Sequence, residues 1–281
     1  MKFFKKNSEL FVPYGGDGVA ALKKATHLAV AAHQDDAEII GFEGIAKSYL
    51  SKDKSFAAVI VTDGAGSART GRYAAFTDDD MKNIRRLEQK NAAHAGSYGA
   101  LALLDYTSAE VKNPADTNVG ADLDKIFGAC APEVVYTHSP ADKHDTHIGV
   151  VVKTLDALRR LPKNRLPKKL YGCEVWRDLD WVCDGDKAVM DVTGYDSLSA
   201  CLLGAFDSQI AGGKRYDLAV EGRRRANATF FASHSADNAD RLIFALDMTP
   251  LLSGGDIVDF ALGHIDKFKR DVETRLRKII G

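Results

Sequence analysis

The sequence predicts an α/β protein with a Rossmann-like, mostly parallel β-sheet and helices on both of its faces. Short, continuous apolar runs such as 27–32 and 56–61 indicate buried strands. Segments with apolar residues at helical spacing follow these runs, and the order strand, helix, strand, helix is typical of a parallel sheet. With 281 residues, 45% of them hydrophobic, the chain is long enough to bury such a core.

The expected elements alternate along most of the chain. Thr77 and the three aspartates after it favour a helix start, because a hydroxyl caps the first turn and acids suit the positive end of a helix. The last helix has one broad apolar face, which predicts that it packs on the rest of the molecule. Strands are predicted at 27–32, 56–61, 100–104, 133–137, 171–176 and 187–192. Helices are predicted at 15–25, 38–50, 78–97, 148–160, 195–209, 217–232 and from Asp256 onward.

A basic, proline-containing connector at 161–169 separates two parts of the predicted fold. We expect a single domain over 1–281, with a core at about 27–160 and a C-terminal α/β lobe at about 170–281 packed on it. No internal repeat or low-complexity segment interrupts this organisation.

Composition argues against several classes of protein. A net charge of −1 gives no electrostatic case for nucleic-acid binding. No run of 18 apolar residues is present, so no membrane span is expected, and the N-terminus lacks the apolar segment of a signal peptide. The cysteines are scattered, which favours reduced thiols in a cytoplasmic protein; a homo-oligomer stays open. They are Cys130, Cys173, Cys183 and Cys201.

Two polar segments follow buried strands and carry the candidate chemistry. The first contains His33, Asp35 and Asp36, directly after the strand at 27–32. The second contains His144 and His147, whose spacing of three places them on one side of a helical turn. Because the carboxyl ends of parallel strands share one edge of the sheet, we expect the two segments to meet.

A divalent metal explains why these residue types gather there. Two adjacent carboxylates repel each other unless a cation or donors compensate them, and His33 and Asp36 are ligand types that zinc accepts. Asp35 and Asp36 point apart in an extended chain, so in a turn one can bind metal while the other faces the substrate. Three protein ligands leave a position open for water, whose pKa zinc lowers towards roughly 7.

The same residues allow other interpretations. An isolated H-x-x-H is usually a surface or capping pattern, and an isolated Asp-Asp pair is usually a solvated turn. Glycosidase carboxylates flank the sugar from separate positions about 5–10 Å apart, which adjacent aspartates fit poorly. The placement of both segments after buried strands favours the metal site.

The segment His33-Gln34-Asp35-Asp36-Ala37-Glu38, together with His144-Asp145-Thr146-His147, resembles the motifs of the PIG-L / LmbE-like family of metal-dependent N-deacetylases. The resemblance covers roughly residues 27–230. Further matching positions are VIVTDGAGS at 59–67, Arg85, Glu88, Glu174, Trp176, Asp191, Ser208 and Gln209.

The resemblance implies a role for each motif residue. His33, Asp36 and His147 correspond to the zinc ligands. Asp35 corresponds to the general base that activates water, and His144 to the residue that stabilises the oxyanion or protonates the leaving nitrogen.

This chain departs from the family pattern at two places. Gln34 stands where proline is usual, which we expect to loosen the turn. Thr146 replaces the aspartate of the second motif and Asp145 replaces its proline, so the carboxylate that orients a histidine is absent, displaced by one residue, or supplied by Asp142.

Substrate-binding residues are predicted outside the motifs. Arg85 is similar to a family arginine that binds substrate. Arg69 and Arg72, in the loop after the second strand, are candidates for an anionic part of the substrate, although a solvated loop explains them equally well. Trp176 is a candidate wall of a sugar site. The glycine loop at 62–67 lacks phosphate-loop spacing, so no nucleotide cofactor is expected.

The expected activity is hydrolysis of an N-acetyl group from an N-acetylglucosamine-containing small molecule or glycoconjugate, by metal-bound water with Asp35 as base. Zn²⁺ is the expected metal, and Fe²⁺ suits the same two-histidine, one-carboxylate set. A metal-dependent amidase acting on a non-sugar amide, a non-catalytic sugar- or nucleotide-binding module, and an inactive family member are the alternatives.

Overall fold

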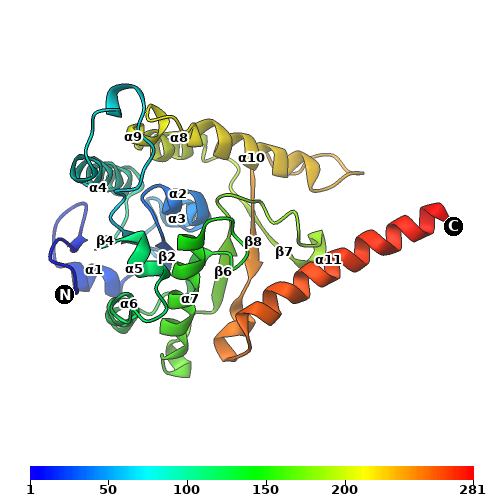
Figure 1. The fold of residues 1–281 in the computed structure, drawn as a ribbon, viewed down its shortest axis with the longest axis horizontal. Helices are drawn as coiled ribbons and strands as arrows, with labels where there is room; N and C mark the ends of the chain where they lie inside the picture. The colour runs from blue at the N-terminus through cyan, green and yellow to red at the C-terminus, as the bar shows by residue number, and fades with distance from the viewer.

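A computed structural model describes all residues, 1–281, and shows one eight-stranded sheet between two layers of helices (Figure 1). The strand order is β1-β4-β3-β2-β5-β6-β8-β7, with β4, β3, β2, β5 and β6 parallel and the other three strands antiparallel to their neighbours. The strands are β1 (Glu9–Phe11), β2 (His27–Ala31), β3 (Phe56–Thr62), β4 (Ala100–Tyr106), β5 (Val134–His138), β6 (Lys169–Cys173), β7 (Lys187–Asp191) and β8 (Leu242–Asp247). The predicted fold class is confirmed.

Eleven α-helices accompany the sheet. They are α1 (Gly18–Lys23), α2 (Asp36–Ile40), α3 (Phe42–Ser48), α4 (Asp78–Ala95), α5 (Ser108–Lys112), α6 (Asn118–Ala129), α7 (Asp145–Arg159), α8 (Asp196–Gly204), α9 (Asp207–Ile210), α10 (Tyr216–Phe230) and α11 (Ile257–Ile280). None of these helices combines the length and apolarity that crossing a membrane requires.

The sheet separates two hydrophobic cores because successive side chains of a strand point to opposite faces. In β2, Leu28 and Val30 face the core that α1, α6 and α7 cover. Ala29 and Ala31 face the core under α2, α3, α4 and α8. Every residue of β2 and β3 is buried, which explains why both strands are continuous apolar runs in the sequence.

Several predicted elements differ from the observed ones. The helix expected at 38–50 is two helices that meet at Gly41, where a Cβ would lie 3.1 Å from the Phe56 ring. The helix expected at 148–160 begins at Asp145, because the side chain of His144 caps it. The helix expected at 195–209 is divided into α8 and α9. Strands β1 and β8 and helices α5 and α6 were not predicted.

In the C-terminal part of the chain, the strands join the sheet of the core, whereas the last helix does not pack along it. Strands β6, β8 and β7 extend the same sheet as the N-terminal strands, so the predicted lobe shares its sheet with the core. Helix α11 instead has no buried residue and extends away from the body (Figure 1). The expectation that its apolar face packs on the molecule is wrong for most of the helix.

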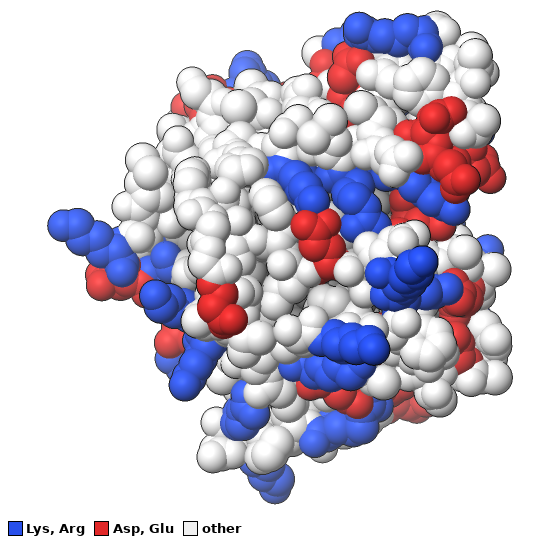
Figure 2. Space-filling view, turned by 90° about the vertical axis from the view of Figure 1, so that its left-hand side faces the viewer, with Lys and Arg blue, Asp and Glu red and all other residues white.

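All four cysteines are free thiols; Cys130 and Cys173 are buried, whereas Cys183 is half-buried and Cys201 is exposed, so not all of them belong to the core. On the face drawn in Figure 2, basic and acidic side chains lie interspersed and form no single-sign patch.

Candidate metal centre and the cavity around it

The two polar segments meet beside β2, where the order of the strands in the sheet changes direction. Strand β2 is followed by β3 and β4 on one side of it, whereas β5 and β6 lie on its other side. The carboxyl ends of strands at such a reversal form a crevice in open α/β sheets. His33 and Asp36 follow β2, and His147 lies in the first turn of α7, after β5.

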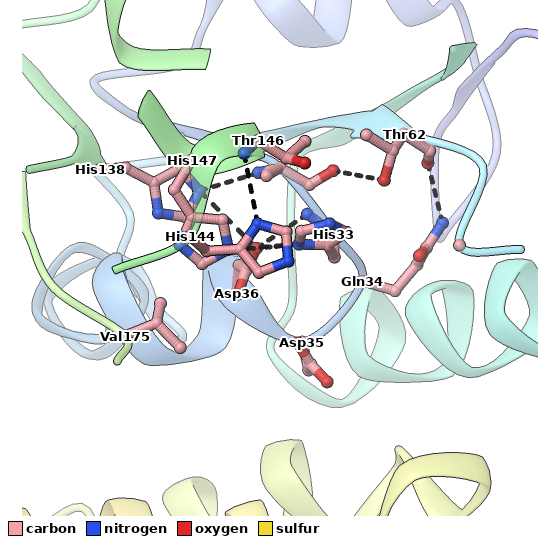
Figure 3. Close-up of polar contacts among 12 residues, drawn as sticks. His33, Gln34, Asp35, Asp36, Thr62, His138, His144, Thr146, His147 and Val175 are labelled. Atoms are coloured by element: carbon pink, nitrogen blue, oxygen red, sulfur yellow. Dashed lines mark hydrogen bonds and ion pairs between the residues drawn. The ribbon is translucent and has the colours of Figure 1, made fainter. Parts of the chain in front are cut away.

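Three side-chain atoms form a nearly equilateral triangle at this point (Figure 3). The Nδ1 atom of His33 lies 3.1 Å from Oδ2 of Asp36 and 3.2 Å from Nε2 of His147. The third side, between His147 Nε2 and Asp36 Oδ2, measures 3.3 Å. Asp36 and His147 are almost fully buried, so water compensates neither of them.

This triangle fits a tetrahedral metal ion. Zinc binds histidine nitrogen and carboxylate oxygen at about 2.0–2.1 Å, and a tetrahedron of that size places its ligand atoms roughly 3.3 Å apart. The residues His33, Asp36 and His147 can therefore hold a divalent ion and leave its fourth position open. The same donor set also suits Fe²⁺.

Asp142 orients His147. Its Oδ2 atom lies 2.8 Å from Nδ1 of His147, and it also accepts a hydrogen bond from the backbone N–H of Val175 at 3.1 Å. Burial lowers the pKa of His147, but the carboxylates of Asp36 and Asp142 outweigh it and raise the pKa to about 10. The carboxylate that the sequence left unassigned is thus Asp142, whereas Asp145 is exposed and bonds to no histidine.

His138 also lies at the centre, where Asp36, His138 and His147 form another group of side chains close enough to hold a metal ion. Its Nε2 is 3.6 Å from Asp36 Oδ2, and its ring stacks on His147 at 3.9 Å between centroids. The same Nε2 accepts a hydrogen bond from the N–H of Ala32 at 2.9 Å. That bond uses the lone pair of Nε2, so this nitrogen ligates a metal only if the hydrogen bond breaks.

Asp35 turns away from the triangle and faces the cavity (Figure 3). It has a φ of 84°, a left-handed conformation that is uncommon for a residue other than glycine. Its N–H donates to Gln89 at 3.2 Å, and its Oδ2 lies 3.5 Å from the guanidinium of Arg85. Burial raises the pKa of Asp35 to about 8, although Arg85 opposes the rise.

Gln34 stiffens this turn, contrary to the expectation that it would loosen it. Its Nε2 donates to the carbonyl of Thr62 at 3.1 Å, and its Oε1 accepts from Nε of Arg85 at 3.3 Å. Arg85 also donates to the backbone carbonyl of Gln34. The amide therefore ties the turn to β3 and α4 at the position where proline is usual.

His144 lies beside the triangle, and one of its ring nitrogens already takes part in a hydrogen bond. Its Nδ1 accepts a hydrogen bond from the N–H of Thr146 at 3.2 Å, which leaves Nε2 to carry the proton of the neutral ring. Burial lowers the pKa of His144, and the neighbouring His33 and His147 lower it further. A neutral His144 can thus donate one hydrogen bond from Nε2.

A cavity of about 430 Å³ opens above these residues, a size typical of sites for small molecules. Of the predicted substrate-binding residues, Arg85 and Trp176 line it. The Nη1 atom of Arg85 is buried without a hydrogen-bond partner in the protein.

Arg69 and Arg72 do not line the cavity. Arg69 donates to two carbonyls of its own loop, those of Ala65 at 2.6 Å and Phe76 at 3.0 Å. Arg72 pairs with Asp207 at 2.9 Å on the surface. Both guanidinium groups are used within the protein, so the structure gives no support to a substrate contact by either.

The cavity residues missed in the sequence include two lysines and a tyrosine. Lys112 and Lys214 line the cavity without an ion pair, and Lys214 Nζ lies 5.2 Å from the centre of the Trp176 ring. Tyr216 packs edge-on against the same ring at 6.1 Å. They lie at helix termini far from the motifs, and no local pattern distinguishes them from surface residues.

Comparisons with known proteins agree with this arrangement. Residues 28–158 match the family profile described as PIG-L: GlcNAc-PI de-N-acetylase, which confirms the resemblance seen in the two motifs. The search of curated protein sequences gave no match.

Several solved structures share the fold. The conserved protein TT1542 from Thermus thermophilus is 16% identical with a TM-score of 0.61, over 80% of this chain and 94% of that one. GalB, the 4-carboxy-2-hydroxymuconate hydratase from Pseudomonas putida KT2440, is 19% identical with a TM-score of 0.61, over 80% and 96%. The N,N'-diacetylchitobiose deacetylase from Pyrococcus horikoshii is 18% identical with a TM-score of 0.60, over 81% and 85%. At these identities the similarity establishes the fold.

Proposed function

Residues 28–158 belong to the PIG-L family, and on that basis we propose that this protein removes an acetyl group from the nitrogen of an N-acetylglucosamine-type substrate. The observation that carries the proposal is the triangle of His33, Asp36 and His147, whose edges fit a divalent ion with an open position. When bound, that ion polarises a carbonyl and lowers the pKa of water.

Asp35 is the proposed general base. Its carboxylate faces the cavity beside the triangle, and its turn is held by Gln89 and Arg85. Asp35 takes the proton of the attacking water as the new carbon–oxygen bond forms, and a group positioned in this way contributes about 10²–10⁴-fold to a rate.

His144 is the proposed hydrogen-bond donor to the substrate. The neutral ring donates from Nε2 to the oxygen that becomes negative as water adds to the amide carbon. The carbon–nitrogen bond then breaks, releasing acetate and the free amine, and the nitrogen takes up the proton held by Asp35.

The remaining proposed contacts hold the sugar. Trp176 presents an aromatic face to the cavity, and such faces suit the apolar side of a sugar ring. Arg85, which lines the cavity and has an unpartnered Nη1, is the proposed contact to an oxygen of the substrate once a small shift of its side chain exposes that atom.

The test measures amine release. Protein loaded with Zn²⁺ is incubated with N-acetylglucosamine, N,N'-diacetylchitobiose and N-acetylglucosamine conjugates, and free amine and acetate are quantified. We expect turnover that falls by about 10²–10⁴-fold in Asp35→Asn while bound zinc is retained. Asp145→Asn, an exposed residue of α7, is the matched control. A zinc-replete protein that releases no amine from any of these amides contradicts the proposal.

A hydratase acting on a carboxylated small molecule is the second candidate. The unpaired Lys112 and Lys214 in the cavity favour it, since they offer two cations to a carboxylate, and GalB has the same fold. Loss of the ultraviolet absorbance of an unsaturated dicarboxylate, without amine release from amides, distinguishes this activity from deacetylation.

A further inference from the structure

Helix α11 is the longest helix of the protein and its least covered one. It extends from the sheet into solvent (Figure 1), and none of its residues is buried. Beyond Ile257, its large aliphatic side chains expose between 38% and 84% of their surface. A contiguous exposed apolar surface of this kind usually marks a protein or membrane interaction site.

The body of the protein contacts a different side of the helix. Ile257 and Phe260 pack against the core at its first turn, and Lys267 pairs with Asp186 at 2.6 Å. Farther along, Phe268 lines a groove between the helix and the body. The side chains on the exposed apolar side take no part in these contacts.

The exposed apolar side has the spacing of a coiled-coil seam. Its positions follow each other in alternating steps of four and three residues, which is the spacing of the two core positions of a heptad. Six of the seven positions are aliphatic, and the central one is a lysine without an ion pair. The seam consists of Val258, Leu262, Ile265, Lys269, Val272, Leu276 and Ile279.

An acidic row runs beside the seam, on the side away from the body. Asp259, Asp266 and Glu273 follow each other at intervals of seven residues, and all three are exposed. Asp259 and Asp266 form no ion pair, whereas Glu273 pairs with Arg277 on its own helix at 2.7 Å. Charges at such flanking positions determine which helix pairs with which.

The pattern disfavours a second copy of this chain as the partner. In an antiparallel pair of α11 helices, the acidic row of one copy lies along the acidic row of the other. Two parallel helices in register place Lys269 opposite Lys269. Like charges in these positions oppose pairing, so either arrangement penalises self-association.

We propose that α11 is a docking helix for an amphipathic helix of a different polypeptide. The partner has an apolar seam of the same spacing, an acidic residue opposite Lys269, and basic residues along the row of Asp259, Asp266 and Glu273. This role is independent of the catalytic centre.

The test uses the full-length protein and two synthetic fluorescent helices of about three heptads. Both probes have leucine at the seam and a glutamate opposite Lys269; the flanking residues are lysines in one and glutamates in the other. By fluorescence anisotropy we expect the basic probe to bind roughly tenfold to a hundredfold more tightly, because three flanking contacts change from repulsion to attraction. Ile265→Asp should abolish this binding, and Leu218→Asp, an exposed leucine of α10, should not.

Three outcomes overturn the proposal. One is equal or absent binding of the two probes. Another is a dimer in light scattering that Ile265→Asp converts to a monomer, since the partner is then a second copy. The third is α11-dependent binding to phosphatidylserine-containing vesicles with no preference between the probes. Circular dichroism checks folding, and because α11 has no buried residue the substitution should leave the core intact.

Discussion

The two polar segments that form the candidate metal centre are held in place very differently. Residues 33–38 are tied down by several buried groups, among them Gln34, Arg85 and Gln89, around a left-handed turn at Asp35. In the second segment the ring of His147 stacks on His138, but only one side chain, Asp142, forms a hydrogen bond to its Nδ1. The comparison indicates that several hydrogen bonds hold the turn of the first segment, whereas a single carboxylate orients the candidate ligand of the second.

The largest effect is expected when either segment loses a ligand. Asp36→Ala and His147→Ala should each abolish stoichiometric zinc binding and lower amide hydrolysis by about 10³-fold or more, because the remaining two donors cannot hold a catalytic ion. Elemental analysis and amine release measure both properties, with Asp145→Ala as control. Retention of zinc by one variant alone would mean that a single segment holds the ion.

The next largest effect is the pH dependence of metal affinity, which arises at His147, where the two segments meet. In the metal-free protein the pKa of His147 is raised to about 10, so at neutral pH this imidazole carries a proton that a metal must displace. Metal affinity should therefore rise with pH, by about tenfold per unit between pH 6 and 9 and by roughly a hundredfold over two units. Calorimetry in buffers of different ionisation enthalpy should detect the released proton; a pH-independent affinity argues against this charge state.

A smaller loss is expected when the second segment loses its orienting carboxylate. Asp142→Asn should weaken zinc binding by about 10–100-fold, the usual cost of removing an outer-shell partner of a histidine ligand. Asp145→Asn, three residues away and exposed, should leave affinity unchanged. Equal effects of the two substitutions would refute the assignment of Asp142.

The smallest effect on metal binding is expected in the redundantly held segment. Gln34→Ala removes two buried hydrogen bonds and should destabilise the protein by about 1–3 kcal/mol. Zinc affinity should change less than threefold or so, because Arg85 still bonds to the backbone of the turn. Thermal unfolding and zinc titration test this. If Gln34→Ala weakens zinc binding more than Asp142→Asn does, the first segment depends more on a single side chain than the second does.

Sequence patterns predicted the elements that can be recognised from consecutive residues alone. The apolar runs at β2, β3 and β5 are visible because both faces of these strands are buried. The break at Gly41 was not predicted, although the close approach of Ala29 and Phe56, from two neighbouring strands, leaves no room for a side chain there. Strand β8 was missed although its residues Leu242–Asp247 are mainly apolar.

In the candidate site, too, some features could be predicted from the sequence and others could not. His33 and Asp36 could be singled out from the sequence, because they follow a predicted strand and have the chemistry of ligands, whereas the preference for His147 over His144 depended on the resemblance to the PIG-L family. Arg69 and Arg72 could not be excluded, since a loop arginine that bonds to its own backbone has the same sequence as one that faces a cavity.

By itself, the sequence determined the α/β fold class, most strands of the parallel part of the sheet, the resemblance to the PIG-L family, and the two segments that carry candidate ligand chemistry, because each depends on residues close together in the chain. Tertiary structure alone decided that Asp142 orients His147, that Gln34 braces the turn at Asp35, and that α11 leaves its apolar seam uncovered. These features depend on the distance between residues far apart in the chain. Strand register and core packing set that distance, and an amphipathic pattern does not reveal whether its partner belongs to the same molecule.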